Sequence, residues 1–316
     1  MANKHPLRFG IQTGQQNLEW TDLLGLWQAA DDWGYDSMWI FDHLYPIYSD
    51  PNGPCMEGWT TLAALAQATS KTRIGHLVNG NTYRHPSLTA KSAATLDIIS
   101  EGRLNLGLGA GWFELEHQSL GFDFKTTLGR LAALDEACSI IKGMLAGDKV
   151  TLAGEHYQVN EAQCRPLPLQ DGGPPLMIGG VGRKVLLKIA AKWADMWNAP
   201  GSPEVMADLI SVIRRHGDEV GRDTDEIEKT VMLPLCYTPD TELQELVVSL
   251  LAGAFELSPE ESRARAMIGQ KQECLDKVAA YEAAGVTHFI FMLIAPFDRD
   301  QIQGFAEEVI PAVRPA

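Results

Sequence analysis

The sequence predicts a (β/α)8 TIM barrel, in which eight parallel strands close into a ring with helices around it. Short apolar runs alternate with longer amphipathic segments along the chain, which is the pattern of a parallel sheet. Eight apolar runs can be counted, and 316 residues is an ordinary length for one barrel. Unusual residues gather directly after these runs, where barrels carry their sites. An open doubly wound sheet is the structural alternative, but it rarely holds eight regular repeats.

The predicted strands are the short apolar runs. In chain order they cover 7–12, 37–41, 72–80, 103–111, 175–180, 194–200, 228–237 and 287–294. A longer tract of mixed polarity, 150–174, is expected to form a small hairpin and a loop laid over the barrel. Loop insertions at the carboxyl-terminal face of the barrel are also expected at 44–57, 113–127 and around 253–270.

Amphipathic segments between the strands are predicted as helices. The first, 19–34, ends at a glycine, and the third, 86–100, has proline in its first turn, which is a favoured position there. The other helices are expected at 58–70, 128–145, 183–193, 204–221 and 299–313, with an interrupted helical stretch over 242–285. No shift in composition marks a second domain, so residues 1–316 are expected to form a single domain.

Charge and cysteine content limit the classes of partner and compartment. The net charge of −15 argues against nucleic acid and anionic membrane as partners, because both require clustered Lys and Arg. No segment has the apolar core of a signal peptide or the length of an uncharged membrane span. Five scattered cysteines without a CxxC pair fit free, mostly buried thiols in a reducing compartment. We therefore expect a cytoplasmic protein.

Asp42 and His43 directly follow the second predicted strand. In a purely structural role, Asp42 caps the following turn and His43 is satisfied by a hydrogen bond. At a barrel strand end, however, both side chains reach the mouth, and histidine titrates near neutral pH. The barrel prediction therefore favours a catalytic role. No metal site is expected, because the first strand ends FGIQTGQQ, without an HxH pair, and no HExxH motif occurs.

Glycine-rich segments follow the fourth and fifth predicted strands. In IGGVGRK, residues 178–184, the glycines precede a helix whose N–H groups and dipole favour phosphate; the alternative is a tight turn with solvated basic residues. In LGLGAGW, residues 106–112, Trp112 stands where a dinucleotide loop would have its last glycine. These glycines leave room for a flat ligand that Trp112 stacks on, or they serve close packing. Residues 79–81, Asn-Gly-Asn, indicate a bulge at the third strand end.

In this order, these residues resemble the bacterial luciferase-like monooxygenase superfamily over nearly the whole chain. The resemblance rests on several tracts taken together. They are LRFGIQ (7–12), GYDSMWIFDH (34–43), NTYRHP (81–86), ATLDIISEGRLNLGLGAGW (94–112), PLMIGGVGRK (175–184), ADMWN (194–198) and AAGVTHFIF (283–291). The chain is most similar to the branch that uses the deazaflavin coenzyme F420 instead of FMN. The resemblance implies a barrel with the cofactor at the strand ends, a small-molecule substrate and a homodimer.

Site residues are carried over from the resemblance position by position. Asp42 and His43 match the family's Asp-His pair, whose histidine faces the reactive centre of the ring. Leu77, Val78 and Asn79 match the bulge that backs the ring, often through a cis peptide, which is placed here at Leu77–Val78. The remaining expected cofactor contacts lie after the fourth strand and in the phosphate loop after the fifth. They are Gly109, Trp112, Gly179, Gly180, Val181, Gly182 and Arg183.

The resemblance implies hydride transfer between coenzyme F420 and a small organic substrate, with His43 donating or accepting the matching proton. Some sugar-phosphate dehydrogenases of this branch carry a catalytic glutamate directly after the fourth-strand glycines. This chain has Trp112 there, with Glu114 and Glu116 beyond it, which disfavours a sugar phosphate. Two alternatives stay open: an FMN-dependent monooxygenase that uses O2, and a flavin-binding protein without catalytic activity.

Overall fold

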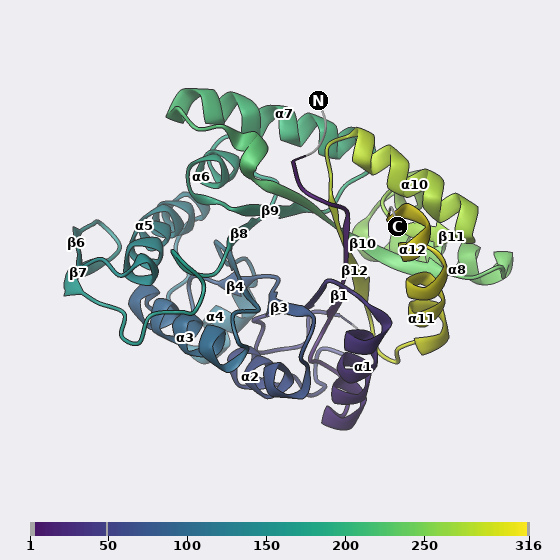
Figure 1. Ribbon diagram of the computed structural model, residues 1–316, viewed down its shortest axis with the longest axis horizontal. Helices are drawn as coiled ribbons and strands as arrows, with labels where there is room; N and C mark the ends of the chain where they lie inside the picture. Colours follow the sequence, from purple (N-terminus) through teal and green to yellow (C-terminus); the bar gives the residue numbers. More distant parts are fainter. Residues whose placement is uncertain (1–3, 49, 315–316) are drawn as a thin grey trace.

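Eight parallel strands form a closed barrel in the computed structural model, which describes residues 4–48 and 50–314 (Figure 1). The predicted domain, 1–316, therefore extends past the described residues at both ends. Around the ring the strands are β1 (Arg8–Thr13), β2 (Ser37–Ile40), β3 (Arg73–His76), β5 (Leu104–Gly109), β8 (Leu176–Gly179), β9 (Met196–Ala199), β10 (Glu228–Tyr237) and β12 (His288–Leu293). Each pairs with the next, and β12 pairs with β1, which closes the barrel and confirms the predicted fold class.

Helices surround this ring, as Figure 1 shows. They are α1 (Trp20–Trp33), α2 (Gly58–Ala68), α3 (Pro86–Ile99), α5 (Thr127–Ala146), α6 (Leu186–Trp193), α7 (Pro203–Val220), α10 (Lys271–Ala283) and α11 (Arg299–Glu308), followed by the short α12 (Ile310–Val313). The predicted helix 299–313 is divided at Val309, because Pro311 in the first turn of α12 has no N–H to continue the hydrogen-bond ladder. A 3-10 turn over Thr224–Glu226 precedes β10.

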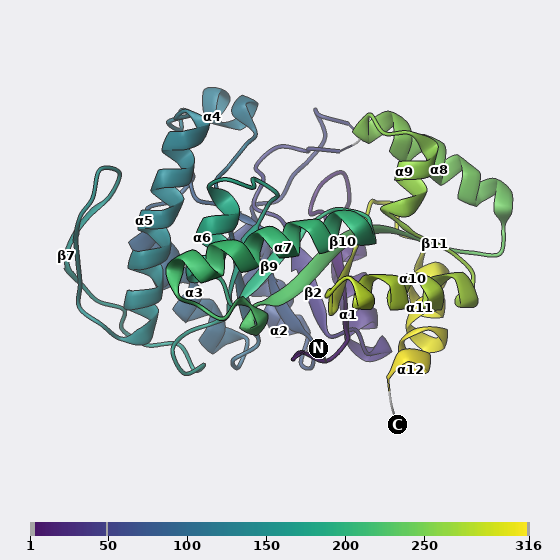
Figure 2. The same cartoon turned by 90° about the horizontal axis from the view of Figure 1, so that it is seen from above.

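The ends of the strands carry additional elements. The expected hairpin within 150–174 is present as β6 (Val150–Ala153) and β7 (Gln158–Ala162), outside α5. A short helix, α4 (Glu114–Leu120), lies in the segment that the sequence predicted as a loop. Helices α8 (Thr241–Phe255) and α9 (Pro259–Ala264) follow β10. Figure 2 shows α4 and α9 at one end of the barrel and both chain termini at the opposite end.

Two sequence predictions are corrected in detail. The helical stretch 242–285 contains a strand, β11 (Met267–Gly269), which pairs in parallel with β10. Its buried side chains favour a strand, and Gly269, at a φ of +131°, cannot continue a helix. The third predicted strand, 72–80, is interrupted: β3 ends at His76, and β4 (Asn79–Gly80) resumes against β5.

The barrel interior is filled at mid-height by one apolar cluster. Its buried members are Trp39, Leu77, Met177, Met196 and Ile290, with Val78 and Met232 packed against them. Below them, at the starts of the strands, the Nε2 atom of His288 lies 2.7 Å from the Ser37 hydroxyl. The Nδ1 atom of His288 lies 3.3 Å from Glu228, which also pairs with Arg8. This end of the barrel is therefore closed, and any ligand site at the barrel axis opens at the carboxyl end of the strands.

Two further observations concern the cysteines and the helices. All five cysteines are free, and four of them are buried, as the sequence predicted. None of the helices formed by residues 4–48 and 50–314 has the length and apolar character required to cross a membrane.

Candidate functional site

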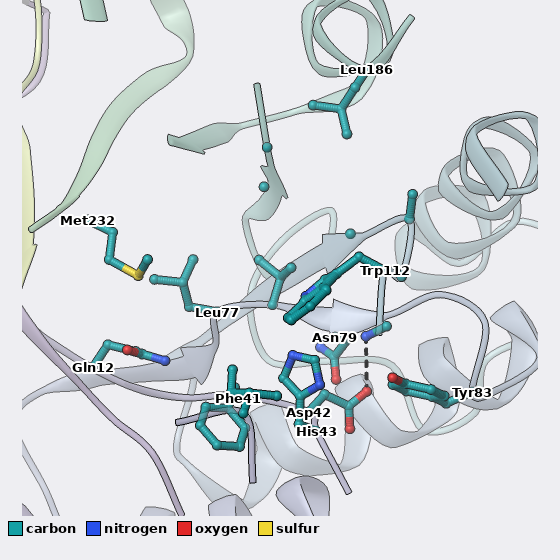
Figure 3. A pocket seen from close by; sticks show the side chains of 18 of the residues that line it. Gln12, Phe41, Asp42, His43, Leu77, Asn79, Tyr83, Trp112, Leu186 and Met232 are labelled. Atoms are coloured by element: carbon teal, nitrogen blue, oxygen red, sulfur yellow. Dashed lines mark hydrogen bonds between the residues drawn. The ribbon is translucent and has the colours of Figure 1, made fainter. Parts of the chain in front are cut away.

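A cavity of 350 Å³ opens at the carboxyl ends of the strands, within the size range of small-molecule sites (Figure 3). Its lining comes from the ends of β1, β2, β4, β5, β8 and β10 and from the loops that follow them. The lining residues are Gln12, Phe41, Asp42, His43, Ile47, Tyr48, Leu77, Val78, Asn79, Gly80, Tyr83, Gly109, Ala110, Gly111, Trp112, Gly179, Gly180, Leu186 and Met232. Nine of the twelve predicted site residues meet here, whereas Val181, Gly182 and Arg183 do not line this cavity.

The floor of the cavity is the interruption between β3 and β4. The Leu77–Val78 peptide is cis, as the resemblance led us to expect. The Val78 side chain packs against two glycines: a Cβ atom added to Gly109 would lie 2.7 Å from Val78 Cγ2, and one on Gly179 would lie 3.0 Å from Val78 Cγ1. Larger residues at either position would displace Val78. Asn79 fixes the same segment by donating from Nδ2 to the Gly107 carbonyl at 2.8 Å.

Asp42 is buried at the edge of this floor. Its Oδ2 atom accepts hydrogen bonds from the Gly80 N–H at 3.1 Å, drawn in Figure 3, and from Arg84 Nη1 at 2.6 Å. Its Oδ1 atom is buried and has no partner in the described part of the chain. Burial raises the pKa of Asp42 to about 6, although the Arg84 charge and the Gly80 N–H oppose the shift. Arg84 also pairs with Glu57 at 2.8 Å, which ties Asp42 to the start of α2.

His43 is held from one side by Glu116. Its Nδ1 atom lies 2.9 Å from Glu116 Oε2, whereas its Nε2 atom makes no hydrogen bond within the described residues. A carboxylate at Nδ1 favours the tautomer with the proton on that nitrogen. In the neutral ring Nε2 is then a free acceptor, and in the protonated ring it is a free donor.

Glu116, near the start of α4, is completely buried, and its carboxylate lies within hydrogen-bond distance of four donors. Besides His43, its carboxylate accepts hydrogen bonds from the Tyr83 hydroxyl and from the backbone N–H groups of Leu44 and Tyr45. Burial alone raises the pKa of Glu116, but the hydrogen bonds from His43, Tyr83 and Tyr45 outweigh it and hold the pKa below its usual value. Glu116 is therefore ionised at neutral pH.

Trp112 forms the exposed wall above this pair. Its indole is 62% exposed, and its centroid lies 5.4 Å from that of His43 at an interplanar angle of 71°. Phe113 lies edge-on to the same imidazole at 5.8 Å. Figure 3 shows the His43 ring beside Trp112 and Asn79. A flat ligand on this floor would contact an apolar wall and one imidazole.

The loop from β8 to α6 borders the cavity at both of its ends, through Gly180 and Leu186. Gly180 has a φ of +131°, and its own N–H is already bonded to the Asn198 carbonyl at 2.9 Å. The backbone N–H groups of residues 181–186, by contrast, find no acceptor in the described part of the chain. Such a run of free donors before a helix suits an anion. The predicted helix 183–193 begins only at Leu186, which leaves the N–H groups of residues 181–185 outside it.

The Arg183 side chain does not line the cavity, although its place in this loop suggested a contact with the cofactor phosphate. Its guanidinium pairs with Asp208 on α7, where both side chains are about half exposed. Its backbone carbonyl lies 2.8 Å from the Nε2 atom of His216. The guanidinium of Arg183 is therefore engaged with α7, whereas the N–H groups of the loop stay free among the described residues.

Several residues of this site had no role assigned from the sequence, among them the polar residues Gln12, Tyr83, Arg84 and Glu116. Tyr83 and Arg84 lie inside the tract NTYRHP but have no distinctive spacing. Glu116 had a usable signal, since acidic residues open the segment Glu114–Leu120 and Gly121 closes it, which is typical of a helix. Gln12 lies near the end of β1, where the sequence has no distinctive pattern beyond its lack of metal ligands.

Comparisons with known proteins agree with this fold. A model of the family described as luciferase-like monooxygenase matches residues 4–255. A relative from Microbacterium testaceum (strain StLB037), named F420-dependent glucose-6-phosphate dehydrogenase, is 27% identical over 334 residues, covering 98% of both chains. The coenzyme F420-dependent tetrahydromethanopterin reductase from Methanopyrus kandleri superposes with a TM-score of 0.83 at 22% identity, covering 98% of this chain and 100% of that one. An F420-dependent secondary alcohol dehydrogenase in complex with an F420–acetone adduct gives 0.84 at 23%, with the same coverage. At these identities the two structures show a shared fold.

Proposed function

Because the chain belongs to the luciferase-like monooxygenase family, we propose that it is an oxidoreductase that transfers hydride between coenzyme F420 and a small organic substrate. The observation that carries this proposal is His43, whose Nδ1 is bound to a buried carboxylate and whose Nε2 is free beside an open cavity. The names of the curated relative and of both structural neighbours, which are F420-dependent, support the cofactor.

The residues present fit such a cofactor. The flat floor of Leu77, Val78 and Asn79 suits one face of a ring, and Gly109 leaves the space that Val78 occupies. The free N–H groups that begin at Val181 suit the phosphate, in the loop that Gly179, Gly180, Gly182 and Arg183 complete. When bound, the deazaflavin ring supplies or accepts the hydride.

His43 then handles the proton that accompanies the hydride. With Glu116 accepting from Nδ1, His43 Nε2 can donate a proton to a carbonyl oxygen or accept one from an alcohol. The carboxylate holds the ring in one orientation and one tautomer. Asp42 would act on the floor instead, because its carboxylate accepts from the Gly80 N–H, at the edge of the floor, and from the Arg84 guanidinium. Trp112 and Phe113 keep water from one side of the imidazole.

Trp112 also indicates which class of substrate suits the site. An indole offers an apolar surface and a single N–H, whereas a sugar phosphate needs many polar partners. We therefore favour alcohols, carbonyl compounds or activated alkenes over the sugar phosphate in the name of the curated relative. A homodimer in the cytoplasm, expected from the sequence, stays a prediction that light scattering of the purified chain and fractionation of cells would check.

Parallel titrations of the full chain with coenzyme F420 and FMN test the proposal. Cofactor fluorescence reports binding in both cases, and the expected result is tight binding of F420 alone. Tight binding of FMN alone would make oxygen-dependent monooxygenation the better assignment. Binding of both cofactors without turnover of any alcohol or carbonyl compound would favour a non-catalytic flavin-binding protein, and binding of neither would overturn the cofactor assignment.

A further inference from the structure

The chain between β5 and α5 contains the helix α4, and its residues 112–124 are defined as the α4 segment. Figure 2 shows α4 at one end of the barrel, beside one end of α5. The buried residues of α4 are Glu116 and His117, whereas its two leucines, Leu115 and Leu120, are 51% and 44% exposed. A short helix that buries no apolar side chain is not held in place by apolar packing. Polar contacts must therefore set the position of α4.

Arg130, near the start of α5, holds both ends of the α4 segment. Its Nε atom donates to the Gly111 carbonyl at 3.0 Å, and its Nη1 atom donates to the Lys125 carbonyl. These two residues directly precede and follow the α4 segment. One guanidinium therefore joins the two ends and closes the segment into a compact loop.

The Arg130 guanidinium is buried without a counterion. The residue is 9% exposed and forms no ion pair within residues 4–48 and 50–314. A buried cation without a carboxylate needs other partners. Besides the two carbonyls, these are the Thr127 hydroxyl, 3.4 Å from Nη2, and the Phe124 ring, whose centroid lies 4.1 Å from the guanidinium carbon. The partners of this charge are thus the ends of the α4 segment and the residues next to them.

His117 fixes the inner side of α4. Its Nε2 atom lies 2.7 Å from the Thr82 hydroxyl, and its ring centroid lies 4.7 Å from that of Phe124, the ring that also covers Arg130. Glu116, the preceding residue, contacts His43 instead. Contacts at both ends of the α4 segment and at its centre therefore hold the carboxylate that holds the imidazole.

We propose that Arg130 is a positioning residue for His43, on which it acts through the α4 segment and Glu116. While both ends of the segment are held, the Glu116 carboxylate stays at His43 Nδ1, keeps the proton on that nitrogen and leaves Nε2 free beside the cavity. Without the guanidinium, α4 would move away from His43, because it buries no apolar residue. The consequence for turnover rests on the proposed function, whereas the consequence for the imidazole does not.

Arg130→Gln tests this role through nitrogen NMR of the histidine rings, which needs neither cofactor nor substrate. We expect His43 to lose its preference for the Nδ1–H form, and the amides of residues 112–124 to exchange hydrogen faster than in the wild type. Turnover should fall roughly 10- to 100-fold, the range for a residue that orients another, with F420 affinity retained. Arg130→Lys keeps the charge and one donor group, so its NMR, exchange and turnover should lie between those of Arg130→Gln and the wild type.

Arg103→Gln is the matched control. Arg103 also donates to backbone carbonyls, but these lie at the end of α2 and in the turn after it, whereas the α4 segment follows the other end of β5. Its loss should lower the melting temperature without changing the His43 spectrum or the hydrogen exchange of residues 112–124. This control separates a general loss of stability from a loss of positioning.

An unchanged His43 tautomer in folded Arg130→Gln would overturn the proposal, as would an equal change of the tautomer in Arg103→Gln. If Arg130→Gln does not fold, Arg130→Lys decides, and a His43 spectrum identical to that of the wild type would overturn the positioning role. Failure of the wild type to bind or turn over F420 would instead overturn the proposed function. The NMR and exchange results would still decide on Arg130 in that case, so the two failures are distinguishable.

Discussion

The Nδ1 atom of His43 lies 2.9 Å from the Oε2 atom of Glu116, 73 positions further along the chain. The contact joins the segment that follows β2 to the short helix α4, which lies at the carboxyl end of the barrel strands. Because Glu116 also accepts the N–H groups of Leu44 and Tyr45, it fixes the turn that leaves β2 as well as the imidazole. One buried carboxylate therefore sets both the position and the tautomer of His43.

Glu116→Gln should remove the preference of His43 for one tautomer. The neutral amide no longer favours the Nδ1–H tautomer, because it can present either an oxygen or an N–H to the ring. We expect turnover to fall roughly 10- to 100-fold, the range for a residue that orients another, with F420 affinity retained. Nitrogen NMR of the histidine rings should show the Nδ1–H form of His43 in the wild type and a mixture in the variant.

Glu114→Gln is the matched control for that substitution. Glu114 lies on the same helix, but its carboxylate is exposed and accepts only from Gln118, at 2.9 Å. Turnover and the His43 spectrum should both stay as in the wild type. If the two glutamine variants lose activity equally, or if the His43 tautomer is unchanged in Glu116→Gln, Glu116 does not act through His43.

His43→Ala should lower turnover and leave the affinity for F420 nearly unchanged. Removing a positioned proton donor or acceptor typically lowers turnover about 10²- to 10⁴-fold. The floor of Leu77, Val78 and Asn79 and the loop after β8 stay in place, so F420 should bind with similar affinity. Fluorescence titration gives the affinity, and the rate of change of F420 fluorescence with an accepted substrate gives kcat. A kcat equal to that of the wild type would show that the proton goes elsewhere.

The sequence predicted the barrel and half of this site well, for identifiable reasons. Asp42, His43 and the glycines lie at strand ends, and in a parallel barrel all strand ends meet at one face, so their convergence follows from topology. Glu116 and Arg84 could not be placed in this way, because they come from segments whose direction depends on tertiary packing. Their partners, His43 and Asp42, are 73 and 42 positions away.

The helices after β10 also depend on tertiary pairing that the sequence alone did not predict. The sequence predicts an interrupted helical stretch over 242–285, but it gives no strand there, whereas β11 pairs with β10 and divides the stretch. No local pattern announces this strand beyond the single Gly269, because three residues are too few to give a strand signal.

The N–H groups of residues 181–186 should bind the coenzyme phosphate, in preference to the guanidinium of Arg183. Val181→Pro removes one of these donors and should weaken F420 affinity about 10-fold, the lower range for a hydrogen bond to a charged group. Arg183→Gln should change the affinity much less, because that side chain pairs with Asp208 at the surface. Fluorescence titration of both variants, with thermal melting to confirm folding, decides. The reverse order of effects would assign the phosphate to Arg183.

The titration of Asp42 should make the free energy of unfolding depend on pH. Its carboxyl group has a pKa of about 6 when folded, against an ordinary value of 3.8 in the unfolded chain. Between these pH values the folded protein keeps a proton that the unfolded chain has lost. The free energy of unfolding therefore falls as the pH rises from about 4 to about 6, and stays at the lower value above that. A shift of this size corresponds to about 3 kcal/mol.

Asp42→Asn removes this titration and replaces the carboxyl group with a neutral group of the same shape. The free energy of unfolding of the variant, relative to the wild type, should therefore increase by about 2 kcal/mol between pH 4 and pH 7. Urea unfolding at the two pH values gives this difference directly. Asp32→Asn, which breaks an exposed pair with Lys71, should differ from the wild type by less than about 1 kcal/mol at both. A constant difference between Asp42→Asn and wild type across this range would mean that Arg84 and the Gly80 N–H fully offset the burial of Asp42.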